Sequence, residues 1–284
     1  MKDMKIKPDD LVDLHMHTCA SDGTLTPLEL IELLKVKQIK VFSITDHDTM
    51  AAINEMHTLA EQAALCFIPG VEVSTSWDTV ELHILTYGVN TEDEALIKIL
   101  NENLKIREEH NRNFISYLVD RHTSVRVEDY DSYEPMLTRG GWKSLNFLLD
   151  LGVVQHMTDV FELINQMGTP MVFPSYQMLI PKLKALGYTL ILAHPPAYKK
   201  GALLETSFLD ELVSLGIDGI ECYSPYYAEG DQESIDYYLT YCRKNDLCIT
   251  SGSDAHGDFI KSRVVGKPKT TFAEIQLNHL MCQT

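Results

Sequence analysis

Short apolar runs alternate with helical patterns along most of this 284-residue chain, and this alternation restricts its possible folds more than any other feature. Strand-like runs lie at residues 11–18, 40–47, 66–74, 80–87, 189–195, 218–223 and 247–254. Between most of them, apolar residues recur at the spacing of one helix face. Alternating strands and helices predict an α/β fold with a parallel sheet, and we expect this sheet to close into a barrel.

The alternation stops near residue 91. A long, charge-rich helical pattern covers residues 92–121, and further helical patterns follow with little strand signal between them. The breaker sequence Gly168-Thr169-Pro170 then precedes the return of the alternation. We therefore predict a first barrel part at residues 1–90, a helical insert domain at residues 91–171 and a second barrel part at residues 172–284.

Acidic residues outnumber basic ones, because 41 Asp and Glu against 24 Lys and Arg give a formal net charge of -17. Such a chain repels the backbone of a long nucleic-acid duplex and favours a small substrate. The sequence has no apolar run of about 18 residues that predicts a membrane span, and its first residues do not resemble a signal peptide. We expect a cytoplasmic protein without a membrane partner, and the oligomeric state stays open.

Two histidines end the first strand-like run. His15 and His17 are two residues apart, so on a strand both side chains point to the same face. The turn that follows carries Asp22, and two imidazoles beside a carboxylate make half of a metal site. For this stretch alone, one buried and one solvated histidine would be an equally good interpretation.

The other strand-like runs also carry metal-binding residue types at or near their ends. Because parallel strands of a barrel open on one face, we expect these side chains to meet there. The predicted metal ligands are His15, His17, Asp22, His47, Glu72, His83, His194, Asp254 and His256. Glu221 also ends a strand-like run, but we leave it out of the site. We interpret the remaining histidines, which lack this context, as solvated or packed: His57, His110, His122, His156 and His279.

Six imidazoles and three carboxylates are too many ligands for one ion and suit two or three divalent ions. Mixed nitrogen and oxygen ligands accept manganese, iron or zinc. Such ions would reverse the local charge and draw a phosphate group into an acidic protein. A hydroxide that bridges the ions could attack phosphorus, so the residues predict hydrolysis of a small phosphoester.

The chain resembles a known family at these residues, the PHP (polymerase and histidinol phosphatase) family. The stretches that carry the resemblance are Asp13-Leu14-His15-Met16-His17-Thr18 with Ser21-Asp22-Gly23, Thr45-Asp46-His47-Asp48, Pro69-Gly70-Val71-Glu72, Leu82-His83-Ile84-Leu85, Leu192-Ala193-His194-Pro195 and Gly252-Ser253-Asp254-Ala255-His256-Gly257. Within the family it looks most like the stand-alone phosphatases of AMP and nucleoside 3',5'-bisphosphates, and some relatives are 5'-3' exoribonucleases on short RNA.

The resemblance implies a distorted (β/α)7 TIM-like barrel with a helical insertion domain and a three-metal site. Glu72 and a hydroxide would bridge the ions. The implied ligand sets are His15, His17, Glu72 and Asp254 for one ion, Asp22, His47 and His256 for a second, and Glu72, His83 and His194 for a third.

The resemblance weakens in the insert. Relatives have Thr/Ser-Arg followed by Pro-His, whereas here Thr138-Arg139 is followed by Gly140-Gly141. Arg139 and Lys143 are candidate contacts to phosphate or base, and exposed structural charges are the alternative interpretation. Asp46 is a candidate for orienting a metal-bound imidazole or for proton transfer.

Two other functions stay open. An amidohydrolase-type hydrolase or deaminase also begins with two histidines on a barrel strand, but it commonly uses a carbamylated lysine, and the ligand-bearing strand ends carry no lysine. A metal-holding accessory module, such as the family supplies within larger polymerases, would bind metal without turnover.

Overall fold

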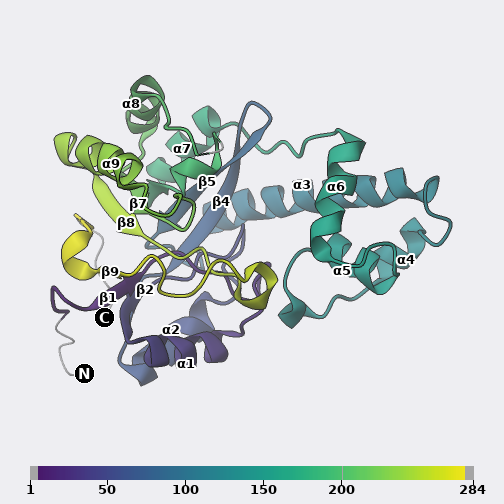
Figure 1. Ribbon diagram of the computed structural model, residues 1–284, viewed down its shortest axis with the longest axis horizontal. Helices are drawn as coiled ribbons and strands as arrows, with labels where there is room; N and C mark the ends of the chain where they lie inside the picture. The colour runs from purple at the N-terminus through teal and green to yellow at the C-terminus, as the bar shows by residue number, and fades with distance from the viewer. Residues whose placement is uncertain (1–5, 200, 279–284) are drawn as a thin grey trace.

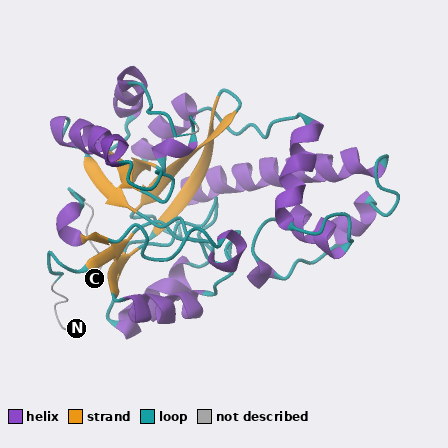
Figure 2. Cartoon of the chain, viewed as in Figure 1, coloured by secondary structure: helices purple, strands orange, loops and turns teal. Residues whose placement is uncertain are grey.

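The computed structural model describes residues 6–199 and 201–278, which form two parts that share the long helix α3 (Glu94–Val119). In Figure 1 the main body lies to the left and contains the β-strands, and the smaller part lies to the right and is built from helices. Figure 2 shows that loops fill the region where the strand ends approach the smaller part.

The strands of the main body belong to two sheets. The first sheet has the order β3-β2-β1-β9 and contains β1 (Leu11–Asp13), β2 (Ile39–Phe42), β3 (Cys66–Phe67) and β9 (Thr270–Thr271). The second has the order β4-β5-β6-β7-β8 and contains β4 (Gly70–Trp77), β5 (Val80–Tyr87), β6 (Thr189–Leu192), β7 (Gly219–Tyr223) and β8 (Cys248–Ser251). The predicted α/β class is therefore confirmed.

The prediction of a closed parallel barrel is wrong for the described residues. The two sheets are separate, and β5 runs antiparallel to both β4 and β6. The cause is local, because only Asp78 and Thr79 separate β4 from β5, and Asp78 adopts a φ of 54°. A two-residue turn joins antiparallel strands, whereas a parallel connection needs a crossover of a dozen or more residues.

The two sheets meet through isolated parallel bridges. Met16, beyond β1, bridges to Ala255, beyond β8, and His47, beyond β2, bridges to Glu72 in β4. The sheets also share an apolar cluster. Its buried members are Val12, Leu14, Val41, Cys66, Ile68, Leu85, Tyr87, Ile191, Ala193 and Cys248. These contacts bring the segments after β1, β2 and β8 to the beginning of β4.

Helices flank the sheets on opposite sides of the main body (Figure 1). The start of helix α1 is fixed locally, because Pro27 occupies its first turn and Thr26 forms a capping box with Glu29. The flanking helices are α1 (Pro27–Lys37) and α2 (Ile53–Ala63) on one side and α7 (Tyr176–Ala185), α8 (Thr206–Leu215) and α9 (Gln232–Lys244) on the other. Short 3-10 helices cover Leu137–Arg139, Pro195–Ala197, Gly257–Ile260 and Phe272–Glu274.

The smaller part has an apolar cluster of its own. Its further helices are α4 (Val127–Ser132), α5 (Lys143–Asp150) and α6 (Met157–Met167). Helix α3 belongs to both parts, since Leu96 and Leu100 lie in the core of the main body and Phe114 and Leu118 lie in the cluster of the smaller part. The domain boundaries at residues 91 and 171 stay predictions.

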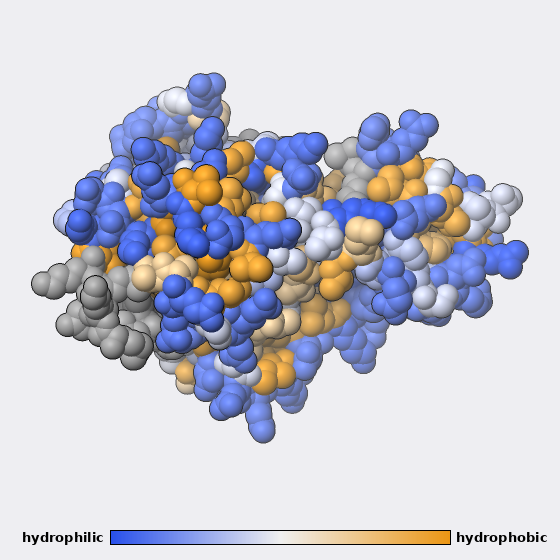
Figure 3. All heavy atoms as spheres, turned by 90° about the horizontal axis from the view of Figure 1, so that it is seen from below, coloured by the Kyte–Doolittle hydropathy of each residue, from blue (hydrophilic) through white to orange (hydrophobic). Residues whose placement is uncertain are grey.

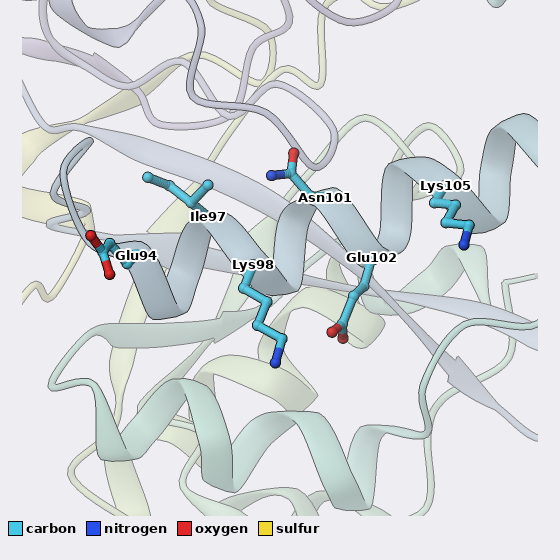
Figure 4. Close-up of a pocket in the computed structure, with 6 residues that line it drawn as sticks. All are labelled: Glu94, Ile97, Lys98, Asn101, Glu102 and Lys105. Carbon is cyan, nitrogen blue, oxygen red and sulfur yellow. The ribbon is translucent and has the colours of Figure 1, made fainter.

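The surface mixes hydrophobic and hydrophilic residues. Figure 3 shows one face, on which hydrophobic residues gather toward the middle of the main body and hydrophilic residues surround them. An open pocket on α3 (Figure 4) is lined by acidic, basic and uncharged side chains, namely Glu94, Ile97, Lys98, Asn101, Glu102 and Lys105. Within residues 6–199 and 201–278, the helices fall short of the length and apolar content that a membrane span needs.

Candidate metal centre

The segment after β1 places His15 and His17. The backbone of this segment pairs with the segment after β8, since Asp254 N donates to His15 O and His17 N donates to Ala255 O. Both imidazoles are buried. The two segments pass so closely that a Cβ atom added to Gly252 would lie 2.1 Å from Cβ of His15. Gly252 therefore allows His15 and Asp254 to come together.

Four side chains form the first group of ligand atoms. Nε2 of His15 lies 3.2 Å from Oε2 of Glu72 and 3.4 Å from Oδ1 of Asp254. Nε2 of His17 lies 3.2 Å and 3.1 Å from the same two oxygens. The four atoms are close enough to surround one ion, and the four residues are those that the resemblance implies for the first metal.

A second group surrounds Asp22. Its Oδ2 atom lies 3.4 Å from Nε2 of His256 and 3.9 Å from Nε2 of His47. Nδ1 of His17 is 3.6 Å from Oδ1 of Asp22, so His17 joins this group as well as the first. The group thus contains the implied ligands of the second metal together with His17.

A third group gathers around the other oxygen of Glu72. Its Oε1 atom lies 3.0 Å from Nδ1 of His83 and 3.0 Å from Nε2 of His194. His47 also approaches Glu72, with Nδ1 3.3 Å from Oε2. The ligand atoms that fit one ion come from His47, Glu72 and His83, so His47 faces two groups. The resemblance implies His194 in place of His47 as the third ligand here, and His194 lies beside this group at Oε1 of Glu72.

Glu72 and His83 occupy other strand positions than we predicted. Glu72 is the third residue of β4, and His83 lies in the middle of β5, so neither ends a strand. The antiparallel register pairs Glu72 with Leu85 and Ser74 with His83, which puts both side chains on one face of the hairpin. The hairpin thus achieves the convergence that we had expected from parallel strand ends.

The buried polar atoms of this centre fit a set of cations. Within the described residues, the Nε2 atoms of His15 and His17 and the Oε2 atom of Glu72 lack any partner with hydrogen-bond geometry, although each nitrogen lies 3.2 Å from that oxygen. Buried polar groups without hydrogen bonds are costly, and a divalent ion would satisfy these atoms. Imidazole nitrogen and carboxylate oxygen are suitable donors for manganese, iron or zinc.

The electrostatics agree with this fit. Burial would lower the pKa of His83, but the carboxylates of Glu72 and Glu81 raise that pKa to about 10. Burial would raise the pKa of Glu72, but the neighbouring imidazoles of His15 and His83 hold it well below its ordinary value. Glu72 and Glu81 therefore favour a proton on His83, in a place where a metal ion would replace it.

Glu221 belongs to the surroundings of the centre, although we left it out of the predicted site. Its Oε1 atom lies 3.0 Å from Nδ1 of His15, and its Oε2 atom accepts a hydrogen bond of 2.8 Å from the backbone N–H of His194. Asp254 is held in a similar way by two donors. Arg263 Nη1 and the hydroxyl of Tyr226 both donate hydrogen bonds to its Oδ2 atom. These contacts fix the orientation of groups that face the centre.

Asp46 holds a loop through its hydrogen bonds. It accepts hydrogen bonds from Thr18 N, Thr18 Oγ1 and Ser21 Oγ, and thereby fixes the turn that carries Asp22. These three bonds run to Thr18 and Ser21, and the orientation of a metal-bound imidazole by Asp46 stays a prediction. Its role in proton transfer stays a prediction.

The candidate substrate contacts lie in the insert and pair with neighbours there. Arg139 Nη1 lies 2.5 Å from Oδ1 of Asp150, and Lys143 Nζ donates to the backbone oxygen of Asp131. The segment after Arg139 nevertheless reaches the centre, because Gly141 N donates to Asp22 O at 2.8 Å. Arg139 is therefore two residues from a direct contact with the metal-site loop.

The histidines that we interpreted as solvated or packed lie outside the three ligand groups in the described residues. His110, for example, contacts the backbone oxygen of Thr169. The other described members of this set, which are exposed or partly exposed, are His57, His122 and His156. His279 lies outside the described residues.

Comparison with known proteins agrees with this geometry. Residues 13–145 match the model of the PHP domain. The chain is 27% identical over 262 residues to a 3',5'-nucleoside bisphosphate phosphatase from Chromobacterium violaceum, with 90% of each chain covered. It is 28% identical over 258 residues to the 5'-3' exoribonuclease Rnm of Salmonella typhimurium, which covers 87% of this chain and 85% of that protein.

Two solved structures are also similar to this chain over most of its length. A protein from Bifidobacterium adolescentis that has been assigned as a metal-dependent phosphoesterase matches with a TM-score of 0.78 and 25% identity over 93% of both chains. An amidohydrolase structure from Chromobacterium violaceum, with bound sulfate and no metal, matches with a TM-score of 0.72 and 25% identity over 87% of this chain and 88% of that one. Residues 13–145 therefore match a PHP domain, and over most of its length the chain is similar to metal-dependent phosphoesterases, hydrolases that act on phosphoric esters.

Proposed function

We propose that this protein removes a phosphate group from a nucleotide-sized phosphomonoester, AMP or a nucleoside 3',5'-bisphosphate. The position of Glu72 carries this proposal. Its Oε2 atom faces His15 and His17, and its Oε1 atom faces His83 and His194. One carboxylate that faces two ligand groups is suited to bridge two ions that act on the same phosphoryl group. The similarity to a 3',5'-nucleoside bisphosphate phosphatase supports the substrate class.

Two or three divalent ions, manganese, iron or zinc, would occupy the three ligand groups. When bound, they would stabilise the charge of the phosphoryl oxygens and make a water molecule more acidic. The proposed ligands are His15, His17, Asp22, His47, Glu72, His83, His194, Asp254 and His256. The chain itself provides the fixed positions of these ligands, since Gly252, Asp46 and Glu221 hold the segments that carry them.

Arg139 and Lys143 complete the proposal as contacts to substrate phosphate or base. The contact of Gly141 with the loop of Asp22 supports this role, because it brings the end of the Leu137–Arg139 turn to the edge of the centre. The guanidinium of Arg139 has donors beyond the one that faces Asp150. Arg139→Met should raise KM more than it lowers kcat, whereas Arg112→Met, at an exposed Arg that pairs with Asp131, should leave both unchanged.

Exoribonuclease activity on short RNA is the second candidate, because the chain is 28% identical to the exoribonuclease Rnm. The experiment is a turnover screen of AMP, a nucleoside 3',5'-bisphosphate, a short oligoribonucleotide and an amide, after chelation and again after Mn²⁺ is added. We expect metal-dependent phosphate release from the mononucleotides, lost in His17→Ala and kept in His57→Ala. Turnover of the oligoribonucleotide alone would favour the second candidate, and turnover of the amide alone would contradict both.

A further inference from the structure

The insert contacts the metal centre through one face of helix α3. Asn103 and Arg107 are four residues apart, so they lie on the same helix face, and both are buried. The side-chain amide of Asn103 donates to Oδ1 of Asp48 and to the backbone oxygen of Ser74, at 2.7 Å each. Asp48 follows His47, so α3 holds the segment of one proposed ligand against the strand that carries another.

Arg107 makes the second contact of this face. Its Nη2 atom donates hydrogen bonds of 2.8 Å to Oγ of Ser74 and to Oε1 of Glu81, and thereby joins β4 to β5. The guanidinium is stacked against aromatic rings, 4.3 Å from the ring centre of Trp142 and 5.0 Å from that of Phe173. A buried, stacked arginine of this kind has little freedom to move.

Glu81 contacts both Arg107 and His83, so the fixed position of Arg107 also restricts His83. The two residues are two positions apart in β5, so their side chains share one face. The Oε1 atom that accepts from Arg107 also lies 3.1 Å from Nε2 of His83. The other ring nitrogen, Nδ1, is the one that lies 3.0 Å from Oε1 of Glu72. A carboxylate this close to Nε2 restricts the ring orientation and favours a proton on Nε2, while Nδ1 faces Glu72 and the proposed metal.

We propose that Glu81 and Arg107 are positioning residues for His83, and that helix α3 thereby sets the geometry of the ligand group His47, Glu72 and His83. Neither residue touches the substrate in this role. The insert then has a function at the metal centre that is separate from any contact with substrate. This inference rests on the proposed metal site and does not depend on which phosphoester is the substrate.

The test is calorimetric titration of metal-free protein with Mn²⁺. His83→Ala identifies the binding step that needs this ligand. We expect Glu81→Ala and Arg107→Met to weaken the same step about 10- to 100-fold, as loss of a group that orients a metal ligand typically does. The other binding steps should change by less than about 3-fold. The double variant should be no weaker than the weaker single one, because the two residues act in series.

Two controls come from the same helix. Arg112→Met removes an exposed arginine that pairs with Asp131, and Asn101→Ala removes an exposed asparagine (Figure 4), so both should leave every binding step unchanged. If Arg107→Met does not fold, Glu81→Gln and Arg107→Lys, which keep the size of the side chains, replace it. Unchanged binding in folded variants, or equal weakening of all steps, would overturn the proposal. Because metal binding is measured directly, this result is independent of the turnover screen.

Discussion

Glu221 and His15 form a contact between two sheets, with Oε1 of Glu221 3.0 Å from Nδ1 of His15. Glu221 is the third of the five residues of β7 in the second sheet, and His15 follows β1 in the first. The second carboxylate oxygen accepts from the backbone N–H of His194. The carboxylate of Glu221 can therefore accept hydrogen bonds from two proposed metal ligands, His15 and His194.

The first prediction concerns this carboxylate. Glutamine at position 221 offers only one acceptor oxygen, so its amide group would face either the N–H of His15 or that of His194. We expect Glu221→Gln to lower metal affinity and phosphatase activity about 10- to 100-fold in a folded protein. Metal titration and kinetics check this, with the exposed Glu233→Gln in α9 as control. Wild-type affinity in Glu221→Gln would refute the role.

Metal removal should lower the thermal stability of the protein. A ligand that binds only the folded state stabilises it by about 2.7 kcal/mol when its free concentration is 100 times Kd. The midpoint of thermal unfolding should therefore rise steadily with added Mn²⁺ and fall in chelator. Scanning calorimetry over a series of Mn²⁺ concentrations measures this. An unfolding midpoint that does not change with Mn²⁺ would count against metal binding by the folded centre.

Gly252→Ala should disturb the metal centre through a steric clash rather than through backbone strain. The added Cβ atom would lie 2.1 Å from Cβ of His15 and 2.6 Å from Oε1 of Glu221. Overpacking of this kind costs about 1–3 kcal/mol of unfolding free energy, and here it also displaces a metal ligand. Denaturant unfolding and metal titration should both show the loss.

Gly88→Ala provides the comparison for that variant. Gly88 has a φ of 75°, but an added Cβ atom would meet nothing within 4 Å among the described residues. We expect it to lose stability through the unfavourable φ and to keep metal affinity. Equal metal affinity in the two variants would contradict the proposed role of the close approach at Gly252.

The buried tyrosines predict alkaline instability. Burial raises the pKa of Tyr176, Tyr188 and Tyr238 to about 12 each, from an ordinary value of 10.0. A phenol whose pKa is higher in the folded state stabilises the fold below pH 10, and this stability is lost as the pH rises toward 12. Spectrophotometric titration should show late ionisation of these tyrosines that accompanies unfolding. Ionisation of all tyrosines near pH 10 in folded protein would contradict it.

The sequence predicted most of the candidate ligands because the signal is local. His15, His17, His194 and Asp254 lie within four residues after the ends of short strands, and backbone hydrogen bonds between these segments bring them together. The pattern also separated the histidines of the centre from those on helices, such as His57. A strand followed within a few residues by a metal-binding residue is visible without any knowledge of distant contacts.

The rest depends on contacts between distant segments. The two-residue turn at Asp78 makes β4 and β5 a hairpin, and its register alone decides that Glu81 faces the same side as His83. Arg107 reaches Glu81 only because α3 crosses from the insert to the main body. Glu221 was assigned no role because its partner, His15, is 206 positions away in the sequence. The Asp-Thr pair between two alternating runs was the signal that could have revealed the hairpin.

The most direct test of the account is anomalous X-ray diffraction from crystals of the protein grown with Mn²⁺. The account predicts peaks among His15, His17, Glu72 and Asp254, among Asp22, His47 and His256, and beside Glu72 and His83. Two or three such peaks around Glu72 would confirm that these distant segments form one metal centre. Peaks only elsewhere on the molecule, with these side chains unbound at saturating Mn²⁺, would contradict it.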